Sequence, residues 1–231
     1  MLNVSVIVPV YNERDTVLEI LQKIKDKNFA GTTFEVVVVD DGSTDGSREL
    51  LEARTDLYAK LIKMEKNSGK GAAVKAALHN CTGEYVLFQD ADLEYDPADY
   101  RQMLDIAHKF SPDIVYGSRV LAPQAIRVAY FHHRFGNFLI TLFFNILYNT
   151  TFTDIYSCYL MYKRKLVDVQ QLRENGWSQH LEILARAVKH GRRFYEVPVS
   201  YYGRSFEEGK KIRWFHVFGV FKVMLKERFL R

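Results

Sequence analysis

The stretch VLFQDADLEYDP, residues 86–97, begins as a hydrophobic strand and ends in a run of acids. Asp90, Asp92, Glu94 and Asp96 stand at alternating positions, directly before a proline that prevents the strand from continuing. Carboxylates so close together repel one another, so the segment needs a reason to keep them. Two explanations are open at this point: a metal ion binds among the acids, or the acids are the solvated start of a helix.

Hydrophobic runs of the same kind alternate with helical patterns over the first half of the chain. The runs that predict buried strands are Val4–Val10, Phe34–Ser43, Lys60–Glu65, Glu84–Asp92 and Asp113–Arg119. Residues 13–27 and 69–80, between these runs, have the periodicity or composition of helices. Strands that alternate with helices of about 10–15 residues indicate βαβ units. The sequence therefore predicts an α/β fold, with a mostly parallel central sheet and helices on both of its faces.

Length, cysteines and charge narrow the class of protein. A chain of 231 residues fits one α/β domain with a small appendage. Cys81 and Cys158 cannot form a disulfide framework, so unpaired thiols in a reducing compartment are expected. Met1 leads straight into a strand pattern, so no signal peptide is expected. Residues 210–231 hold seven Lys or Arg and one acid, a net charge of +6, which leaves −2 for the rest of the total of +4.

Two segments have the composition of membrane-facing helices. Residues 124–152 contain a long apolar and aromatic segment, and residues 135–153 contain no charge over 19 positions, close to the ~20 needed to span a bilayer. Their asparagines are costly in hydrocarbon, so we expect a helix on the membrane surface or on the domain face instead of a span. Residues 212–231 place aromatic and aliphatic side chains at helical spacing between lysines. This pattern favours interfacial membrane binding over nucleic-acid binding, with packing on the domain as the alternative.

Polar residues follow each of the first four predicted strands. They are residues 9–13, Asp40–Asp41, residues 67–70 and Asp90–Asp92. Ligands of open parallel sheets bind beyond the carboxyl ends of the strands, so these groups are expected to converge on one crevice. Paired carboxylates there offer the oxygen ligands that Mg²⁺ and Mn²⁺ share with substrate phosphates. The metal explanation of the acids is therefore favoured.

The segment GKGAAV, residues 69–74, resembles part of a dinucleotide-binding fingerprint. It follows the third predicted strand, whereas the fingerprint follows the first, and no acid lies where the ribose would be held. The sequence therefore argues against a Rossmann dehydrogenase.

Six motifs occur in the order and spacing of family-2 glycosyltransferases. They are VIVPVYNE (6–13), VVVVDDGSTDGS (36–47), NSGKGAAV (67–74), QDADLEYDP (89–97), YGSR (116–119) and TDIYSCY (153–159). With EVPVSYYGRSFEEGKKI (196–212), the chain most resembles the branch of dolichyl-phosphate mannose synthase and bacterial polyprenyl-phosphate sugar transferases, over about residues 3–213. The resemblance implies a GT-A fold, a nucleotide-sugar donor, a divalent metal ion and inversion at the anomeric carbon.

The resemblance also implies roles for individual residues. Contacts to the nucleotide sugar fall on Pro9, Tyr11, Glu13, Val39, Asp41, Asp90, Ala91, Asp92, Arg119, Arg204 and Lys210. The ligands of Mg²⁺ or Mn²⁺ fall on Asp90, Asp92 and Glu94, and phosphate-binding cations on Arg119, Arg204 and Lys210. Catalytic roles are expected for Asp92, Asp154 and Arg204.

The acceptor side is less determined by the sequence. In relatives that glycosylate a hydroxyl, an acid near Asp154 serves as general base, whereas a phosphate acceptor needs none and Asp154 would then orient it. Glu182 matches a family acid whose role stays open. The chain departs from the common pattern at Leu160, where many relatives have Lys, and at His180, where an acid is usual.

The resulting hypothesis is a metal-dependent hexosyltransferase that moves one sugar from GDP-mannose or a UDP-hexose to a polyprenyl or dolichyl phosphate. Its catalytic domain is expected over residues 1–211, with 124–152 facing acceptor and membrane, and a basic amphipathic helix over 212–231. The protein is expected to bind peripherally to the cytoplasmic face of the membrane and not to bind nucleic acid. Whether it has a membrane-protein partner or forms a homo-oligomer is left open by the sequence. The alternatives are a transferase for glycan hydroxyls and a non-catalytic nucleotide-sugar-binding subunit.

Overall fold

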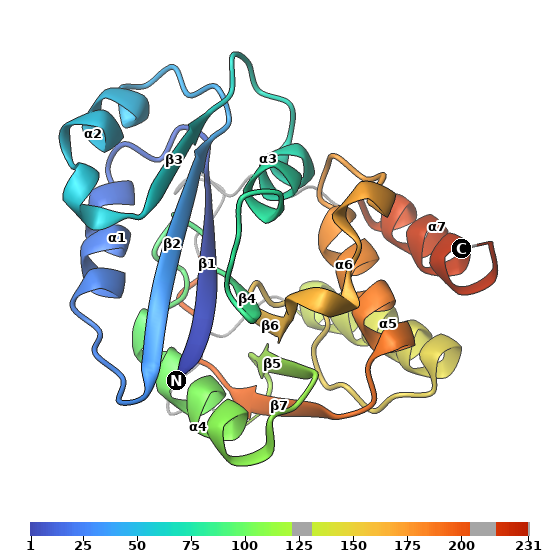
Figure 1. The fold of residues 1–231 in the computed structure, drawn as a ribbon. Helices are drawn as coiled ribbons and strands as arrows, with labels where there is room; N and C mark the ends of the chain where they lie inside the picture. Colours follow the sequence, from blue (N-terminus) through green and yellow to red (C-terminus); the bar gives the residue numbers. More distant parts are fainter. Residues whose placement is uncertain (122–130, 204–215, 231) are drawn as a thin grey trace.

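A seven-stranded sheet forms the centre of the protein in the computed structural model, which describes residues 1–121, 131–203 and 216–230 (Figure 1). The strands are β1 (Leu2–Val10), β2 (Thr32–Asp40), β3 (Lys60–Lys63), β4 (Tyr85–Phe88), β5 (Ile114–Ser118), β6 (Leu160–Lys163) and β7 (Phe194–Pro198). Their order across the sheet is β3-β2-β1-β4-β6-β5-β7. All neighbours run parallel except at β6, which is antiparallel to both β4 and β5. The predicted fold class is confirmed.

Helices cover the sheet on both sides. They are α1 (Val17–Lys25), α2 (Ser47–Ala53), α3 (Lys70–Leu78), α4 (Tyr100–Phe110), α5 (Phe131–Tyr148), α6 (Gln179–His190) and α7 (His216–Phe229). Short 3₁₀ turns occur at Thr55–Leu57, Pro97–Asp99, Arg164–Leu166 and Val169–Gln171. Figure 1 shows α1 and α2 on one side of β1, β2 and β3, and α3 and α6 on the other.

The apolar composition of the central strands explains their position. β1 buries Val4, Val6, Ile7 and Val8 completely, so its apolar side chains pack into both layers of helices, as parallel strands covered on two faces require. On α1 the buried side chains are Val17, Ile20, Leu21 and Ile24, spaced as one face of a helix. These two patterns place the core between the sheet and its helices.

The predicted strand over Glu84–Asp92 ends earlier than expected, at Phe88. The backbone of Gln89 still donates to Ile7 O, at 3.0 Å, but the chain then turns, and Leu93 has a positive φ of 62°. The acids therefore lie in a turn beyond β4 and not on the strand itself. This turn brings their side chains over the edge of the sheet.

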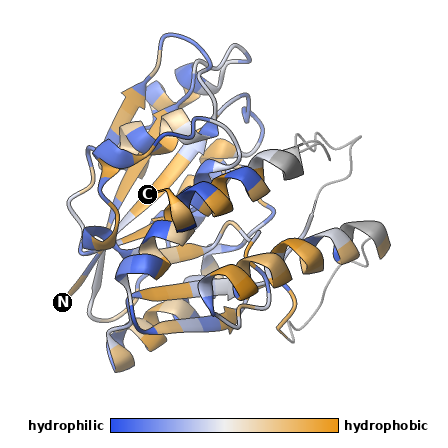
Figure 2. Cartoon of the chain, turned by 90° about the vertical axis from the view of Figure 1, so that its right-hand side faces the viewer, coloured by the Kyte–Doolittle hydropathy of each residue, from blue (hydrophilic) through white to orange (hydrophobic). Residues whose placement is uncertain are grey.

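Helix α5 presents two different faces. Ile140, Phe144 and Tyr148 are buried against the domain, whereas a stripe of large apolar side chains is exposed. The members of this α5 stripe are Phe131, Phe135, Phe138, Leu139, Leu142 and Ile146. Figure 2 shows α5, the lower of its two long helices, as predominantly hydrophobic. Among the described residues, no helix is both long and apolar enough to span a bilayer.

Helix α7 is attached to the domain by buried polar contacts. Glu227 is almost fully buried and accepts from the Arg186 guanidinium of α6 at 3.1 Å, while Lys189 donates to the Glu227 carbonyl at 2.7 Å. The hydroxyl of Tyr148, on α5, donates to Met224 O at 2.8 Å. The described part of the C-terminal segment is thus packed on the domain, the alternative that the sequence left open.

Replacing Glu227 with glutamine is expected to destabilise the protein by about 1–3 kcal/mol, because the buried Arg186 loses a charged partner. Urea unfolding of the purified variant measures this change. Arg228→Gln is the matched control, since Arg228 is exposed on the same helix. Equal stability of the two variants would contradict a structural role for the Arg186–Glu227 pair.

Candidate functional site

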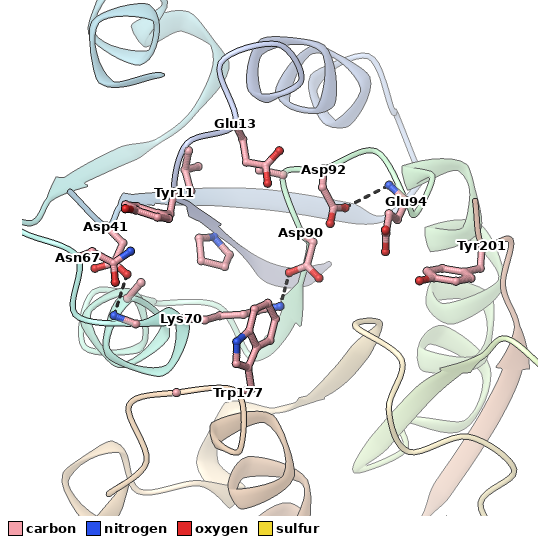
Figure 3. A pocket seen from close by; sticks show the side chains of 16 residues that line it. Tyr11, Glu13, Asp41, Asn67, Lys70, Asp90, Asp92, Glu94, Trp177 and Tyr201 are labelled. Atoms are coloured by element: carbon pink, nitrogen blue, oxygen red, sulfur yellow. Dashed lines mark hydrogen bonds and ion pairs between the residues drawn. The ribbon is translucent and has the colours of Figure 1, made fainter. Parts of the chain in front are cut away.

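A cavity of about 420 Å³ opens beyond the carboxyl ends of β1, β2, β3 and β4 (Figure 3). Its lining is Pro9, Val10, Tyr11, Glu13, Asp41, Asn67, Gly69, Lys70, Ala73, Asp90, Ala91, Asp92, Glu94, Gly176, Trp177 and Tyr201. All four polar groups predicted at the strand ends contribute residues to it. They meet because parallel strands deliver their carboxyl ends to one edge of the sheet.

Asp41 organises the wall of the cavity next to α3. Its carboxylate accepts the backbone N–H groups of Ser68 at 2.8 Å and Gly69 at 2.9 Å. Burial raises the pKa of Asp41, although these two hydrogen bonds oppose the shift. Asp41 therefore uses the first amide group of the segment at residues 69–74, that of Gly69. Residues 70–74 belong to α3, which follows β3 and not β1, so the segment does not have the position of a dinucleotide-binding loop.

Asp90 is paired with a cation. The Lys70 ammonium donates to Asp90 Oδ1, and both side chains are about three quarters buried, with exposures of 24% and 22%. Burial alone would raise the pKa of Asp90, but the charge of Lys70 outweighs it and the pKa is lowered. The same ammonium lies 5.4 Å from the centre of the Trp177 ring, a cation–π contact.

Asp92 and Glu94 occupy the turn after β4. Glu94 N donates to Asp92 Oδ1 at 3.1 Å, and the carbonyl of Glu94 accepts from Tyr202 N at 2.9 Å. The second contact ties the acidic turn to the segment that carries Tyr201, another residue of the cavity lining. The first contact thus holds the Asp92 carboxylate on the backbone of the turn, and the second holds the turn on the segment after β7.

The acids fit a hard divalent cation whose remaining coordination positions are filled by a phosphorylated ligand and water. In the described parts of the chain, no three acidic, histidine or cysteine side chains are grouped as a ready metal site. Mg²⁺ usually binds one or two carboxylates and takes its other ligands from phosphates and water. Asp90 and Asp92 both reach the cavity, and Asp90 already attracts a cation, the Lys70 ammonium. This donor set suits a metal that arrives with a phosphorylated substrate.

Arg119 and Asp154 form a buried ion pair outside the cavity lining. Arg119 Nε and Nη2 donate to the two carboxylate oxygens at 2.6 and 2.8 Å, and the backbone N–H groups of Arg119 and Tyr156 donate at 3.1 Å each. The Asp154 side chain is 3% exposed. Burial would raise the pKa of Asp154, but Arg119 outweighs burial and lowers it. A low pKa and four donors make this carboxylate a weak base.

Arg119 reaches the cavity indirectly. Its guanidinium lies 5.1 Å from the centre of the Tyr201 ring, and Tyr201 lines the cavity. The resemblance implied a phosphate-binding role for Arg119, which stays a prediction; in the structure this side chain contacts Asp154 and Tyr201. Its charge is largely balanced by Asp154.

The described cavity lining does not include Val39 or Glu182. Val39 is on β2, and its side chain is fully buried in the core. Arg204 and Lys210 lie outside the described residues, so their predicted roles stay predictions. Glu182 is fully buried and accepts the backbone N–H of Arg173 at 2.8 Å, so it holds the loop before α6.

Of the two departures from the family pattern, Leu160 is in the protein interior and His180 is half-buried at the start of α6. Leu160 is fully buried on β6. His180 is 2.7 Å from the Tyr116 hydroxyl, and burial, with the nearby Lys70 charge, lowers its pKa to about 3. His180 is therefore neutral at physiological pH and cannot replace an acid.

Trp177 and Tyr201 are cavity residues that the sequence analysis missed. Trp177 belongs to no strand end; it enters the cavity from the loop that precedes α6, and Tyr201 enters from the segment after β7. An aromatic residue next to Gly176, in a polar loop, was the signal available for Trp177.

The comparisons with known proteins identify the family. The model of glycosyl transferase family 2 matches residues 5–169, which include most of β1 and all of β2 to β6. The chain belongs to glycosyl transferase family 2. The matched range also contains Asp41, Lys70, Asp90 and Asp92 of the cavity.

Two relatives illustrate the range of the family members that this chain resembles. Glycosyltransferase AglJ of Haloferax volcanii is 33% identical over 204 residues, which are 87% of this chain and 63% of that protein. The undecaprenyl-phosphate 4-deoxy-4-formamido-L-arabinose transferase of Edwardsiella ictaluri is 30% identical over 213 residues, 90% of this chain and 62% of that protein. The chain thus spans about three fifths of the length of these curated relatives.

Solved structures resemble the chain in fold. TarS of S. aureus, residues 1–349 in complex with UDP-GlcNAc, superposes with a TM-score of 0.66 at 21% identity, covering 97% of this chain and 66% of that one. Glucosyl-3-phosphoglycerate synthase of Mycobacterium tuberculosis, with Mn²⁺, UDP and glucosyl-3-phosphoglycerate, gives 0.68 at 17% identity, covering 98% and 80%. At these identities the likeness shows the GT-A fold alone.

Proposed function

We propose that the protein transfers one sugar, with inversion, from a nucleoside-diphosphate sugar to a polyprenyl phosphate. The observation that carries this proposal is the cavity in which Asp90, Asp92 and Lys70 meet beyond the carboxyl ends of the strands. Support from relatives comes from two proteins, each 30% identical to this chain, that are named undecaprenyl-phosphate 4-deoxy-4-formamido-L-arabinose transferases. GDP-mannose or a UDP-hexose is the proposed donor class.

On the donor side, the residues of the cavity would bind and orient the diphosphate. Asp90 and Asp92, with Glu94 near them, would hold Mg²⁺ or Mn²⁺, which neutralises charge on the departing diphosphate. Support comes from the structural neighbour that carries Mn²⁺ and UDP. The rings of Tyr11 and Trp177 line the cavity and would exclude water from the reacting groups.

On the acceptor side, the state of Asp154 favours a phosphate. A phosphate acceptor is already an anion at neutral pH, so its attack needs no proton to be removed. A hydroxyl acceptor needs a base, and Asp154, the predicted candidate, is a weak base because it is buried and paired with Arg119. The hydroxyl-acceptor transferase remains the second candidate, because the solved relative from M. tuberculosis is named for glucosyl-3-phosphoglycerate.

The experiment is a donor and acceptor panel with purified protein and Mn²⁺. GDP-mannose, UDP-glucose and UDP-GlcNAc are each incubated with a short-chain polyprenyl phosphate or with the matching polyprenol, and glycolipid products are detected by mass spectrometry. Transfer to the phosphate and not to the alcohol supports the proposal. Transfer to the alcohol, or nucleotide binding without turnover on any donor, would replace it by one of the two alternatives.

We also propose that the α5 stripe rests on the membrane that carries the lipid acceptor. Phe131, Phe138 and Ile146 are 82%, 57% and 74% exposed, and they lie on one side of a helix whose other side is packed on the domain. Exposed apolar side chains in such number on a helix are typical of interfacial binding. The exposed Lys222 on α7, which contacts α5, would add attraction to anionic lipids.

A variant with Phe135, Phe138 and Ile146 all changed to serine is expected to bind vesicles at least about tenfold more weakly than the wild type, because burying large apolar side chains is worth ~1.5–3 kcal/mol each. Cosedimentation with vesicles of phosphatidylcholine and phosphatidylglycerol measures the affinity. A control with serine at exposed Leu225 and Phe229 of α7 isolates the contribution of α5. Equal vesicle binding of the triple variant and the wild type would refute the membrane-facing role of α5.

A further inference from the structure

Lys70 lies against Asp90, a carboxylate that the proposed metal ion would bind. Its ammonium donates to Asp90 Oδ1, one of the carboxylate oxygens that the proposed function gives to the metal (Figure 3). The ammonium also lies 5.4 Å from the centre of the Trp177 ring, so it is held between Asp90 and this ring.

The backbone around Lys70 restricts where its side chain can go. Lys70 is the first residue of α3, between two glycines that pack against the loop before α6. A Cβ atom on Gly69 or Gly71 would come within 2.6 Å of the Asn175 backbone, so this contact excludes larger residues. The Trp177 ring lies against the Lys70 ammonium on the same side. These contacts direct the side chain of Lys70 into the cavity, toward Asp90.

The Lys70 ammonium and a divalent ion would compete for the negative charge of one carboxylate. A divalent ion near Asp90 would repel the Lys70 ammonium, and in a partly buried site the repulsion is stronger than in bulk water. Metal binding therefore weakens the contact between Lys70 and Asp90, and an ammonium released into a cavity needs a new anionic partner. The donor's diphosphate is the anion that the proposed function brings into this cavity.

We propose that Lys70 is a resident counter-ion of Asp90 that couples metal binding to donor binding. In the free protein, Lys70 competes with the metal for Asp90. When the metal and the donor arrive together, Lys70 transfers from Asp90 to a diphosphate oxygen and the metal takes its place. This inference rests on the proposed function and adds a coupling between its two ligands. The metal alone binds weakly, and the metal together with a nucleoside diphosphate binds strongly.

The test measures Mn²⁺ binding by the loss of the electron paramagnetic resonance signal of free Mn²⁺, with no nucleotide present. Lys70→Met removes the competing charge and keeps a long side chain against Trp177. This variant is expected to bind Mn²⁺ at least about tenfold more tightly than the wild type, the scale of a lost charge-assisted contact. Lys70→Gln serves as a second neutral variant should Lys70→Met fold poorly.

The second part of the test repeats the Mn²⁺ titrations in the presence of UDP and, separately, GDP. In the wild type, one of these nucleotides is expected to tighten Mn²⁺ binding strongly. In Lys70→Met this gain is expected to shrink about tenfold or more, because the variant has no ammonium to offer the diphosphate. Coupling between two ligands is reciprocal, so nucleotide affinity must show the same change.

Two controls make the result specific. Lys70→Arg keeps the positive charge and is expected to keep the weak binding of Mn²⁺ alone. Lys66→Met removes an exposed charge from the neighbouring loop and is expected to behave as wild type. Unchanged Mn²⁺ affinity in Lys70→Met, or an equal change in Lys66→Met, would overturn the proposal that Lys70 competes with the metal for Asp90. If the nucleotide tightens Mn²⁺ binding in Lys70→Met as much as in the wild type, the proposed transfer of the Lys70 ammonium to the diphosphate is overturned. Either result leaves sugar transfer in the donor panel, and thus the proposed function, untouched.

Discussion

Asp92→Asn is expected to abolish metal-dependent donor binding and to lower sugar transfer by about 10²–10³-fold, the scale of losing one preorganised electrostatic contact to the reacting group. The amide removes the negative charge and changes the volume of the side chain little. The turn should survive, because an asparagine Oδ1 can still accept the hydrogen bond from Glu94 N. The loss therefore reports on the charge at Asp92 and not on the fold.

Calorimetry of nucleoside-diphosphate binding, with and without Mn²⁺, measures this effect separately from turnover. Asp96→Asn is the matched control, because Asp96 lies in the same acidic stretch but outside the cavity, where its Oδ1 accepts from Ala98 N at 2.8 Å. Metal-dependent binding that persists in Asp92→Asn would remove Asp92 from the metal site. A similar loss in Asp96→Asn would indicate a general effect of the acidic turn.

Asp154→Ala is expected to lower the free energy of unfolding by about 3–5 kcal/mol, because it leaves the buried Arg119 guanidinium without its partner. Urea unfolding of the purified variant measures the loss. The double variant Arg119→Met with Asp154→Leu is expected to recover most of the stability, since neither buried charge remains. A loss below about 1 kcal/mol in Asp154→Ala would show that the pair contributes little.

The same pair predicts how stability depends on pH. The pKa of Asp154 is lower in the folded protein than its ordinary value of 3.8, so ionised Asp154 favours the folded state. Its contribution is complete above that ordinary value and is lost as the pH falls toward the lower, folded pKa. The stability difference between the wild type and the double variant should therefore be constant at neutral pH and change only below about pH 4.

The first half of the fold could be predicted because its signals are local. The apolar runs of β1, β2 and β4 stand out in the sequence, and each ends in polar residues that mark the edge of the sheet. β6 is four residues long and β7 begins with a partly exposed FYE, so neither gives a clear run or alternation. Their pairing with β5 depends on contacts between distant segments, which periodicity does not report.

In the candidate site, too, local features could be predicted and long-range contacts could not. The residues after the strands could be placed in one cavity, because the topology of a parallel sheet brings them together. The partners of the charges could not: Lys70 and Asp90 are 20 residues apart, and Arg119 and Asp154 are 35 apart. Each pair depends on how a loop folds back onto the sheet. A family resemblance identifies such residues but does not show whether each is already paired with a neighbouring charged side chain.

The position of β6 has a consequence for the order in which the chain folds. β1, β2, β3 and β4 are hydrogen-bonded to one another without β6, whereas β5 and β7 connect to them only through it. On the ribosome, β5 is made about 45 residues before the strand that joins it to the sheet. We therefore expect the half that carries Asp41, Lys70 and Asp90 to fold first as a four-stranded unit. The later half should dock when β6 inserts, as the slow step set by its long-range contacts.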